Sequence, residues 1–353
     1  MNRLQALTTT LPERGVDGIL VSHIRNVRYL SGFTGSSAYL LLGPSGRFFI
    51  TDFRYQEQAR AEVSGFDIAI VNDDVSDFLV EKARTSGMHV LGVESSVSYA
   101  FYKGLLRKGV RIKALTGFVE DIRKTKEQRE IRTIGLAIER AEKAFSLTRP
   151  FIRPGASELQ VAGMLEENLK KTGCRAAAFD IIVAAGKNGS MPHARPTGNK
   201  IRPGDLVVID WGGEADGYFS DMTRTLLMAG RDISRKREIY EIVLQANREA
   251  IGSVSGGVHA RTVDKTARDV IKKAGYGEYF GHGTGHGVGL EVHELPRISR
   301  IGRETIRPGM VFTIEPGIYL PGTGGVRIED MVLAKTTGCS VLTSLNKTLE
   351  ILH

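Results

Sequence analysis

Short runs of apolar residues alternate with amphipathic segments over the first third of the chain. The runs GILVSH, SAYLLLG, RFFITD, FDIAIV and HVLGVE predict strands at residues 18–23, 37–43, 47–52, 66–71 and 89–94. Between them the helical period predicts helices at residues 52–63, 75–87 and 98–109. PSG at 44–46 predicts a hairpin turn. Residues 1–118 are therefore expected to form an α/β domain without a cluster of chemically reactive side chains.

From about residue 120 onward the pattern repeats itself. RPGDLVVIDWG at 202–212 recurs as RPGMVFTIEPG at 307–317. PGASELQVAGMLEENLKKTG at 154–173 lines up with GGVHARTVDKTARDVIKKAG at 256–275, and each predicts a helix that ends at a glycine after Lys-Lys. A helix-plus-hairpin unit of this length that occurs only twice does not form a solenoid, which needs more and shorter repeats. The repeat therefore predicts a second domain, residues 119–353, built from two pseudo-symmetric halves.

Each copy of the repeat ends in a predicted β-hairpin that carries two acids. Asp210 and Asp221 flank a turn at Asp216-Gly217, a dipeptide typical of hairpins, and Glu315 and Glu329 occupy the second hairpin. Each pair is expected to lie nearly opposite across its strands, and the symmetry would bring four carboxylates to one point. Unpaired carboxylates would repel one another, so the pattern predicts a site for two divalent cations. Solvent-facing strand acids are the alternative, which the matching positions in both copies disfavour.

The segment GHGTGHGVGLEVHE at 281–294 contains His282, His286 and His293, in a chain with eight histidines. Its glycines disfavour a helix and allow the backbone to pass close to a bound ion or substrate. GVGLEVHE predicts a strand that enters the acid site. His193 occupies the matching place in the first copy, where FDIIVAAGKNGSMPH parallels FGHGTGHGVGLEVH. The histidines are expected to bind metal or move protons, with ordinary surface histidines as the alternative.

Composition and charge mainly exclude classes of protein. The net charge of +8 would allow nucleic-acid binding, but basic residues are mixed with acids, as in RKTKEQREIR at 123–132. The run RKR at 235–237 has no interleaved aromatic residues, so no nucleic-acid partner is expected. The sequence shows neither an apolar run long enough for a membrane span nor a signal peptide. Two cysteines are too few for a disulfide framework, which predicts a reducing, cytoplasmic location.

These motifs together resemble the pita-bread metallopeptidase family of methionine aminopeptidase, aminopeptidase P and prolidase. The resemblance is carried by HGTGHGVGLEVHE, by the two aspartates of the first hairpin, and by TIEPG and GVRIED in the second. It implies two divalent metal ions, manganese by preference and cobalt or zinc otherwise. The metal ligands that it implies are Asp210, Asp221, His286, Glu315 and Glu329, with Asp221 and Glu329 bridging the two ions.

The resemblance extends to the first domain. NVRYLSGFTGSS at 26–37 and TDFRYQEQA at 51–59 are similar to the creatinase-type domain of aminopeptidase P and prolidase. The implied function is hydrolysis of peptides with proline at the second position, by a cytoplasmic homodimer. The alternative is a metal-free relative that binds other molecules or performs creatinase-like chemistry. Such relatives typically lack part of the ligand set, which is complete here.

The resemblance also assigns roles outside the metal ligands. Glu315 would exchange a proton with the attacking water, and His193 and His293 would support the tetrahedral intermediate. His282 would contact the substrate, and Arg327 would orient the carboxylates. Arg297 is expected at the rim of the pocket, where its guanidinium would bind the free carboxylate of a dipeptide, or would be a plain surface arginine. We therefore slightly favour a dipeptidase over an aminopeptidase.

Overall fold

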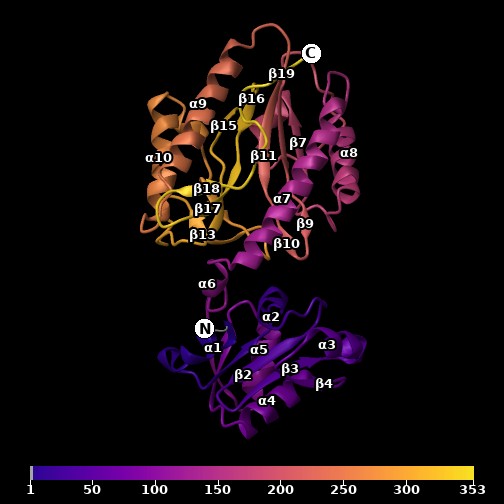
Figure 1. Ribbon diagram of the computed structural model, residues 1–353, viewed down its shortest axis with the longest axis vertical. Coiled ribbons are helices and arrows are strands. Elements are labelled where there is room, and N and C mark those ends of the chain that lie inside the picture. Colours follow the sequence, from indigo (N-terminus) through magenta and orange to yellow (C-terminus); the bar gives the residue numbers. More distant parts are fainter. Residues whose placement is uncertain (1–2) are drawn as a thin grey trace. The chain divides into compact units, whose positions relative to one another are not determined.

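The computed structural model describes residues 3–353, which divide into two compact units (Figure 1). The first unit ends at Arg123 and the second begins at Lys124. This division lies beyond residue 118, where the sequence pattern places the boundary. The reason is that Glu120 accepts a hydrogen bond from Asn26 and Arg123 donates one to the same residue. These contacts attach the helix α6 (Glu120–Arg123) to the first unit.

The first unit is built on a six-stranded mixed sheet of order β4-β3-β2-β1-β5-β6. The β1–β2 and β2–β3 pairs are antiparallel and the other pairs are parallel. The strands are β1 (Gly18–Val21), β2 (Tyr39–Gly43), β3 (Gly46–Thr51), β4 (Asp67–Ile70), β5 (Val90–Glu94) and β6 (Arg111–Leu115). The other helices are α1 (Arg3–Thr9), α2 (Ile24–Ser31), α3 (Gln56–Glu62), α4 (Val75–Thr85) and α5 (Tyr99–Arg107). The predicted strands and helices are therefore present with shifted ends, whereas α1, α2 and β6 were not predicted.

The second unit consists of two similar halves, each with two helices and an antiparallel strand trio. The first half contains α7 (Gln128–Thr148), α8 (Glu158–Lys171), β7 (Ile182–Ala185), β8 (Leu206–Trp211) and β11 (Met222–Met228). The second half contains α9 (Ser234–Gly252), α10 (Ala260–Lys273), β12 (Gly285–Gly287), β14 (Val311–Ile314) and β17 (Asp330–Ala334). In Figure 1 the pair α7 and α8 lies on one side of the strands and the pair α9 and α10 on the other. The predicted duplication is therefore visible in the fold.

Additional strands extend both sheets. The sheet orders are β19-β11-β8-β7 and β13-β12-β14-β17-β18, and two small hairpins pair β9 with β10 and β15 with β16. The added strands are β9 (Glu214–Ala215), β10 (Tyr218–Phe219), β13 (Glu294–Ile298), β15 (Gly317–Leu320), β16 (Gly324–Arg327), β18 (Cys339–Val341) and β19 (Ile351–Leu352). Across residues 3–353, none of the helices combines the length and the apolar character that a bilayer span requires.

Local sequence explains why these elements form. Ser157 caps the start of the helix α8: its hydroxyl accepts from the Gln160 amide, and the Gln160 side chain accepts from the Ser157 amide. The strand β8 is apolar on both faces because helices cover one face and the opposite half of the unit covers the other. Trp211 at its end stacks on Phe145 of α7, with ring centroids 4.4 Å apart. Burial of such side chains fixes the sheet against its helices.

The strand register determines where the acids lie. In the second half Ile314 pairs with Asp330, so the next residues, Glu315 and Glu329, stand opposite each other as predicted. In the first half Asp210 pairs with Thr223, so Asp221 lies two residues away on the same face rather than directly opposite. The predicted turn at Asp216-Gly217 is present, with both residues at positive φ. The second hairpin turns between β15 and β16, and the pairing of Gly317 with Arg327 continues the register of β14 and β17.

Candidate metal centre

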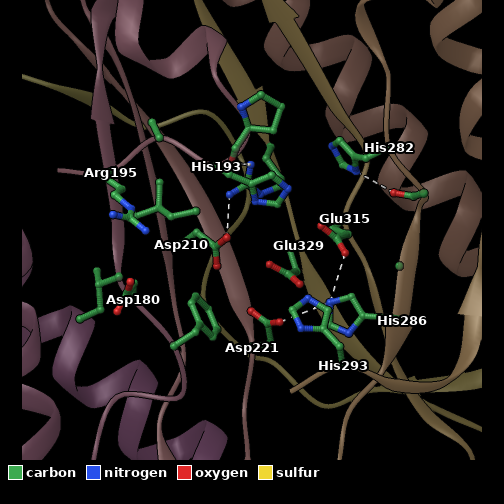
Figure 2. Close-up of a pocket in the computed structure, with 18 of the residues that line it drawn as sticks. Asp180, His193, Arg195, Asp210, Asp221, His282, His286, His293, Glu315 and Glu329 are labelled. Carbon is green, nitrogen blue, oxygen red and sulfur yellow. Dashed lines mark hydrogen bonds and ion pairs between the residues drawn. The ribbon is translucent and has the colours of Figure 1, made fainter. Parts of the chain in front are cut away.

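A cavity of about 630 Å³ lies where the two halves of the second unit meet (Figure 2). Its wall contains every site residue that the sequence predicted: Asp210, Asp221, Glu315, Glu329, His193, His282, His286, His293, Arg297 and Arg327. In Figure 2, Asp221 and Glu329 stand at the centre, Asp210 on one side, and Glu315 with His286 on the other. The cavity therefore has acids from both repeats at its floor.

Three of these residues form a compact group of potential ligands. One oxygen or nitrogen atom of each of Asp221, His286 and Glu329 lies within 4.8 Å of the others. The His286 Nε2 atom is 3.4 Å from Asp221 Oδ2 and 3.4 Å from Glu315 Oε1. Both Asp221 and Glu329 are buried, as the exposed fractions of 4% and 1% show. Carboxylates concentrated in this way need cations to offset their charge.

The electrostatics of the site favour bound cations. Burial raises the pKa of Asp221 well above its usual range, and the charges of Glu329 and Asp210 raise it further. Burial, followed by the charges of Glu315 and Asp210, likewise raises the pKa of Glu329. The Asp210 Oδ1 atom is buried and has no hydrogen-bond partner. A donor set of carboxylates and one imidazole suits divalent ions such as manganese, cobalt or zinc, so the residues present fit the implied metal pair.

The imidazole of His286 is oriented by its own strand and by the next one. The backbone amide of His286 donates to Thr313 Oγ1 at 3.1 Å, and the ring atom Nδ1 lies 3.1 Å from the Gly287 carbonyl oxygen. An Nδ1 proton donated to that carbonyl leaves Nε2 free to face the acids. Burial lowers the pKa of His286, which favours the neutral form that a ligand requires. Gly285 permits this approach, because a Cβ there would meet the Thr313 carbonyl oxygen at 1.9 Å.

A chain of hydrogen bonds connects the first hairpin to the glycine-rich segment. Arg327 donates from Nη2 to Asp210 Oδ2 at 2.6 Å and from Nη1 to the Tyr319 hydroxyl at 2.9 Å. The Tyr319 hydroxyl lies 2.8 Å from His282 Nε2. Arg327 also donates from Nε to Thr223 Oγ1, which in turn donates to Glu329 Oε2 at 2.7 Å. Arg327 therefore contacts Asp210 directly and Glu329 through Thr223.

The remaining histidines line the open part of the cavity. The ring of His293 lies 4.1 Å from that of His286, and burial together with His286 lowers the pKa of His293. His193 is exposed on the loop after β7, and the preceding carbonyl, that of Pro192, accepts a hydrogen bond from Arg327 at 3.2 Å. Arg297 pairs with His286 across β12 and β13, so both residues share one face of the sheet. The structure thus brings all three to the predicted pocket.

One predicted strand is absent, and several residues of the site were not predicted. The segment GVGLEVHE was predicted as a strand, but residues 289–293 form bends between β12 and β13. Gly289 lets the chain turn there instead of extending. Tyr319, Thr223, Asp180 and Arg195 belong to the site but were not predicted. The pairing of Thr223 with Asp210 could have been found from the hairpin register, whereas no sequence signal marks the other three.

Comparison with known proteins places this site in a family. Residues 132–336 match metallopeptidase family M24, and residues 3–125 match the creatinase/prolidase N-terminal domain. A Xaa-Pro dipeptidase of Pyrococcus horikoshii is 37% identical, covering 98% of both chains. The structure of a Xaa-Pro dipeptidase from Bacillus anthracis is similar, with a TM-score of 0.97, 38% identity and 99% coverage of each chain. That of an X-Pro aminopeptidase from Thermotoga maritima has a TM-score of 0.89, 35% identity and 100% coverage of each chain.

The comparisons confirm the predicted resemblance and fold. An α/β domain of the creatinase type precedes a pseudo-symmetric pita-bread domain, and both family matches fall on the units described above. The match to the metallopeptidase family covers more than half of the chain, and the similar proteins align over nearly their full length. This chain belongs to metallopeptidase family M24.

Proposed function

We propose that this protein is a metal-dependent Xaa-Pro peptidase, which hydrolyses the peptide bond before proline and releases the N-terminal residue. The observation that carries the proposal is a cavity lined by four acids and His286, in which Asp221, Glu329 and His286 form a compact group, and Asp210 has an unpaired oxygen. Relatives named Xaa-Pro dipeptidase that align along the whole chain support the substrate class. A metal-free binding protein is disfavoured because every ligand position carries a suitable side chain.

Two divalent ions would be held by residues from both halves of the domain. The residues that would hold them are Asp210, Asp221, His286, Glu315 and Glu329. When bound, the ions polarise the scissile carbonyl and acidify the attacking water. We expect manganese, with cobalt or zinc as substitutes, because the site combines several hard carboxylates with a single imidazole.

The surrounding side chains would handle substrate and protons. Glu315 would accept a proton from the attacking water and pass it to the leaving nitrogen. His193 and His293 would donate hydrogen bonds to the oxygen on which charge develops, since both line the open side of the pocket. His282 would help to position the substrate, because its ring nitrogen is fixed by Tyr319. These groups act on a bond that lacks the N–H of an ordinary peptide.

Arg297 is the group that would distinguish a dipeptide from a longer peptide. It lines the pocket from β13, opposite His286 of β12, and a guanidinium binds a carboxylate through paired hydrogen bonds. In an Xaa-Pro dipeptide the proline itself carries the free carboxylate, which would therefore lie within the pocket. We therefore favour a dipeptidase, and an aminopeptidase acting on longer peptides is the second candidate because of the similar Thermotoga maritima structure.

The decisive experiment measures hydrolysis of Leu-Pro and Leu-Pro-Gly by protein that has been stripped of metal and then reloaded with manganese, cobalt or zinc. Activity should vanish on chelation and return with metal. The variants Asp221→Asn and Glu329→Gln should lose both bound metal and turnover, whereas Glu241→Gln on the exposed face of α9 should keep both. Full activity in the chelated protein would refute the proposal.

The same assay decides the substrate length. Arg297→Ala should raise KM for Leu-Pro about tenfold and leave Leu-Pro-Gly nearly unchanged, because only the dipeptide places its carboxylate there. Equal effects on both peptides would remove the carboxylate role. Faster hydrolysis of the tripeptide by the unmodified protein would identify an aminopeptidase.

We further propose that the protein is a cytoplasmic homodimer. The two cysteines, Cys174 and Cys339, are both unpaired, which suits a reducing compartment. The dimer rests on resemblance to two-domain members of the family. Multi-angle light scattering at micromolar concentration should give twice the 38.6 kDa mass of one chain. A mass of one chain at that concentration would refute the dimer.

A further inference from the structure

Two arginines face the same cavity without a partner among residues 3–353. Arg195 and Arg297 both line the pocket, and neither forms a hydrogen bond or ion pair there, nor does the nearby carboxylate of Asp180. Figure 2 shows Arg195 and Asp180 beyond Asp210, on the side away from His286. Arg297, in contrast, pairs across the strands with His286. The two free guanidinium groups therefore flank the acid cluster from opposite sides.

The backbone that carries Arg195 is firmly held although its side chain is exposed. Glu158, which is fully buried, accepts hydrogen bonds from the amide and the hydroxyl of Thr197 at 3.0 and 2.6 Å. The Ala194 amide donates to the Met191 carbonyl oxygen at 3.1 Å. Proline at position 196 restricts the residue before it to an extended backbone. Because the loop is already ordered, a ligand that binds the guanidinium avoids the cost of ordering the backbone.

An apolar wall lies beside this charged rim. Phe179, Ile181 and Ile182 precede and begin β7 and line the cavity, with Asp180 among them. If Arg297 binds the carboxylate of the substrate, the proline lies on the His286 side of the acids. The residue before proline then lies on the Asp210 side, with its side chain against this wall. In that orientation its far end would face Arg195 and Asp180.

We propose that Arg195 and Asp180 select the residue before proline by charge, an inference that rests on the proposed function. Arg195 attracts a Glu or Asp side chain at that position, and Asp180 attracts Lys or Arg and repels acids. The apolar wall accommodates the hydrocarbon part of either side chain. The structure thus assigns these two residues to substrate specificity, whereas the acids at the centre serve the reaction common to all Xaa-Pro substrates.

Isosteric substrates test the proposal without changing the shape of the side chain. The measured quantity is kcat/KM for Glu-Pro divided by that for Gln-Pro. Arg195→Gln should lower this ratio about two- to fivefold, the range of a solvent-exposed ion pair. Asp180→Asn should raise the ratio by a similar factor and lower kcat/KM for Lys-Pro relative to norleucyl-Pro. Arg231→Gln removes the same charge from an exposed turn outside the pocket and should leave both ratios unchanged.

Failure of this proposal is distinguishable from failure of the proposed function. Turnover of Leu-Pro by the unmodified, metal-loaded protein reports on the proposed function alone, and the control Arg231→Gln should leave it unchanged. If no Xaa-Pro dipeptide is cleaved, the dissociation constant of Gln-Pro divided by that of Glu-Pro, measured by calorimetric titration of the metal-loaded protein, tests the same contact without turnover. A ratio that Arg195→Gln leaves unaltered, by either measurement, overturns the role of Arg195. If Arg231→Gln changes the ratio as much as Arg195→Gln does, the effect comes from the net charge of the protein and not from a local contact. That result would also overturn the role of Arg195.

Discussion

Tyr319 fixes the tautomer of His282 through a directed chain of hydrogen bonds. Because Arg327 can only donate, the Tyr319 oxygen accepts from it at 2.9 Å and the hydroxyl proton points to His282 Nε2. The other ring nitrogen, Nδ1, then donates to the Gly283 carbonyl oxygen at 2.7 Å. Burial raises the pKa of Tyr319 to about 12 and lowers that of His282. At neutral pH the pair is therefore a protonated phenol and a neutral imidazole.

Tyr319→Phe should disturb this chain without removing a metal ligand. We expect unchanged metal content and a fall in kcat of about tenfold, because His282 loses the donor that orients it and Arg327 loses an acceptor. Elemental analysis and steady-state kinetics on Leu-Pro would measure the two effects. Tyr279→Phe, on a partly exposed ring outside the cavity, provides the control. A variant that loses metal would show that Tyr319 supports the ligands themselves.

The contrast between predicted and missed residues has a physical basis. Asp210, Asp221, Glu315 and Glu329 could be predicted because acids directly after apolar strands, at matching places in a repeat, have few structural explanations. Tyr319 could not, because a tyrosine in an apolar strand is usually a core residue. Its role depends on contacts with Arg327 and His282, which lie elsewhere in the sequence and become neighbours only in the folded hairpin β15–β16.

At the scale of elements, α8 holds the loop that carries His193. The carboxylate of Glu158, the first residue of α8, accepts from Asn188 and Asn199 side chains and from the Ala185 amide, in addition to Thr197. These donors lie along residues 185–199, on both sides of His193. A single buried carboxylate thus joins the start of the helix to both ends of the loop. The positive end of the helix dipole further favours its charge.

Glu158→Gln should loosen this loop. The side-chain amide of the substituted residue would place its own N–H groups against the N–H donors that now bind the carboxylate. We therefore expect a loss of about 1–3 kcal/mol in the free energy of unfolding. Hydrogen exchange should accelerate in peptides that cover residues 185–199. Glu166→Gln, on the exposed face of the same helix, should change stability by less than about 0.5 kcal/mol because its partner is the exposed Lys170. Equal effects of the two substitutions would contradict the assignment.

Elements were predicted best where periodicity and turn signals agree. The runs that form β1 to β5 are apolar and bounded by polar or glycine-containing segments, so their positions could be predicted. The strand β6 was missed because most of its residues are exposed and its sequence, RIKAL, carries two charges. The bends at residues 289–293 were missed because their apolar residues, which fill the core between the halves, imitate a strand.

At the scale of the whole molecule, the metal site belongs to one unit. All five proposed ligands lie between Lys124 and His353, and they are drawn from both halves of the repeat. Bound metal would therefore connect two sheets whose acids otherwise repel one another. Because the ions bind the folded form, their binding free energy adds to the stability of that unit.

Loading with metal should accordingly protect the second unit far more than the first. At a free metal concentration 100 times the dissociation constant, the gain is about 2.7 kcal/mol, which slows the exchange of amides that open by unfolding of this unit about a hundredfold. Hydrogen exchange followed by mass spectrometry would compare peptides from residues 206–228 and 311–334 with those from residues 18–51. The last range serves as an internal control because it contributes no ligand. Asp221→Asn should abolish this protection in both hairpins, including residues 311–334, which do not contain Asp221. The reason is that both hairpins share one metal centre, and the loss of the Asp221 carboxylate should release the ions from it. Protection that persists in either hairpin of this variant would mean that the halves bind metal separately, and the shared centre would be wrong.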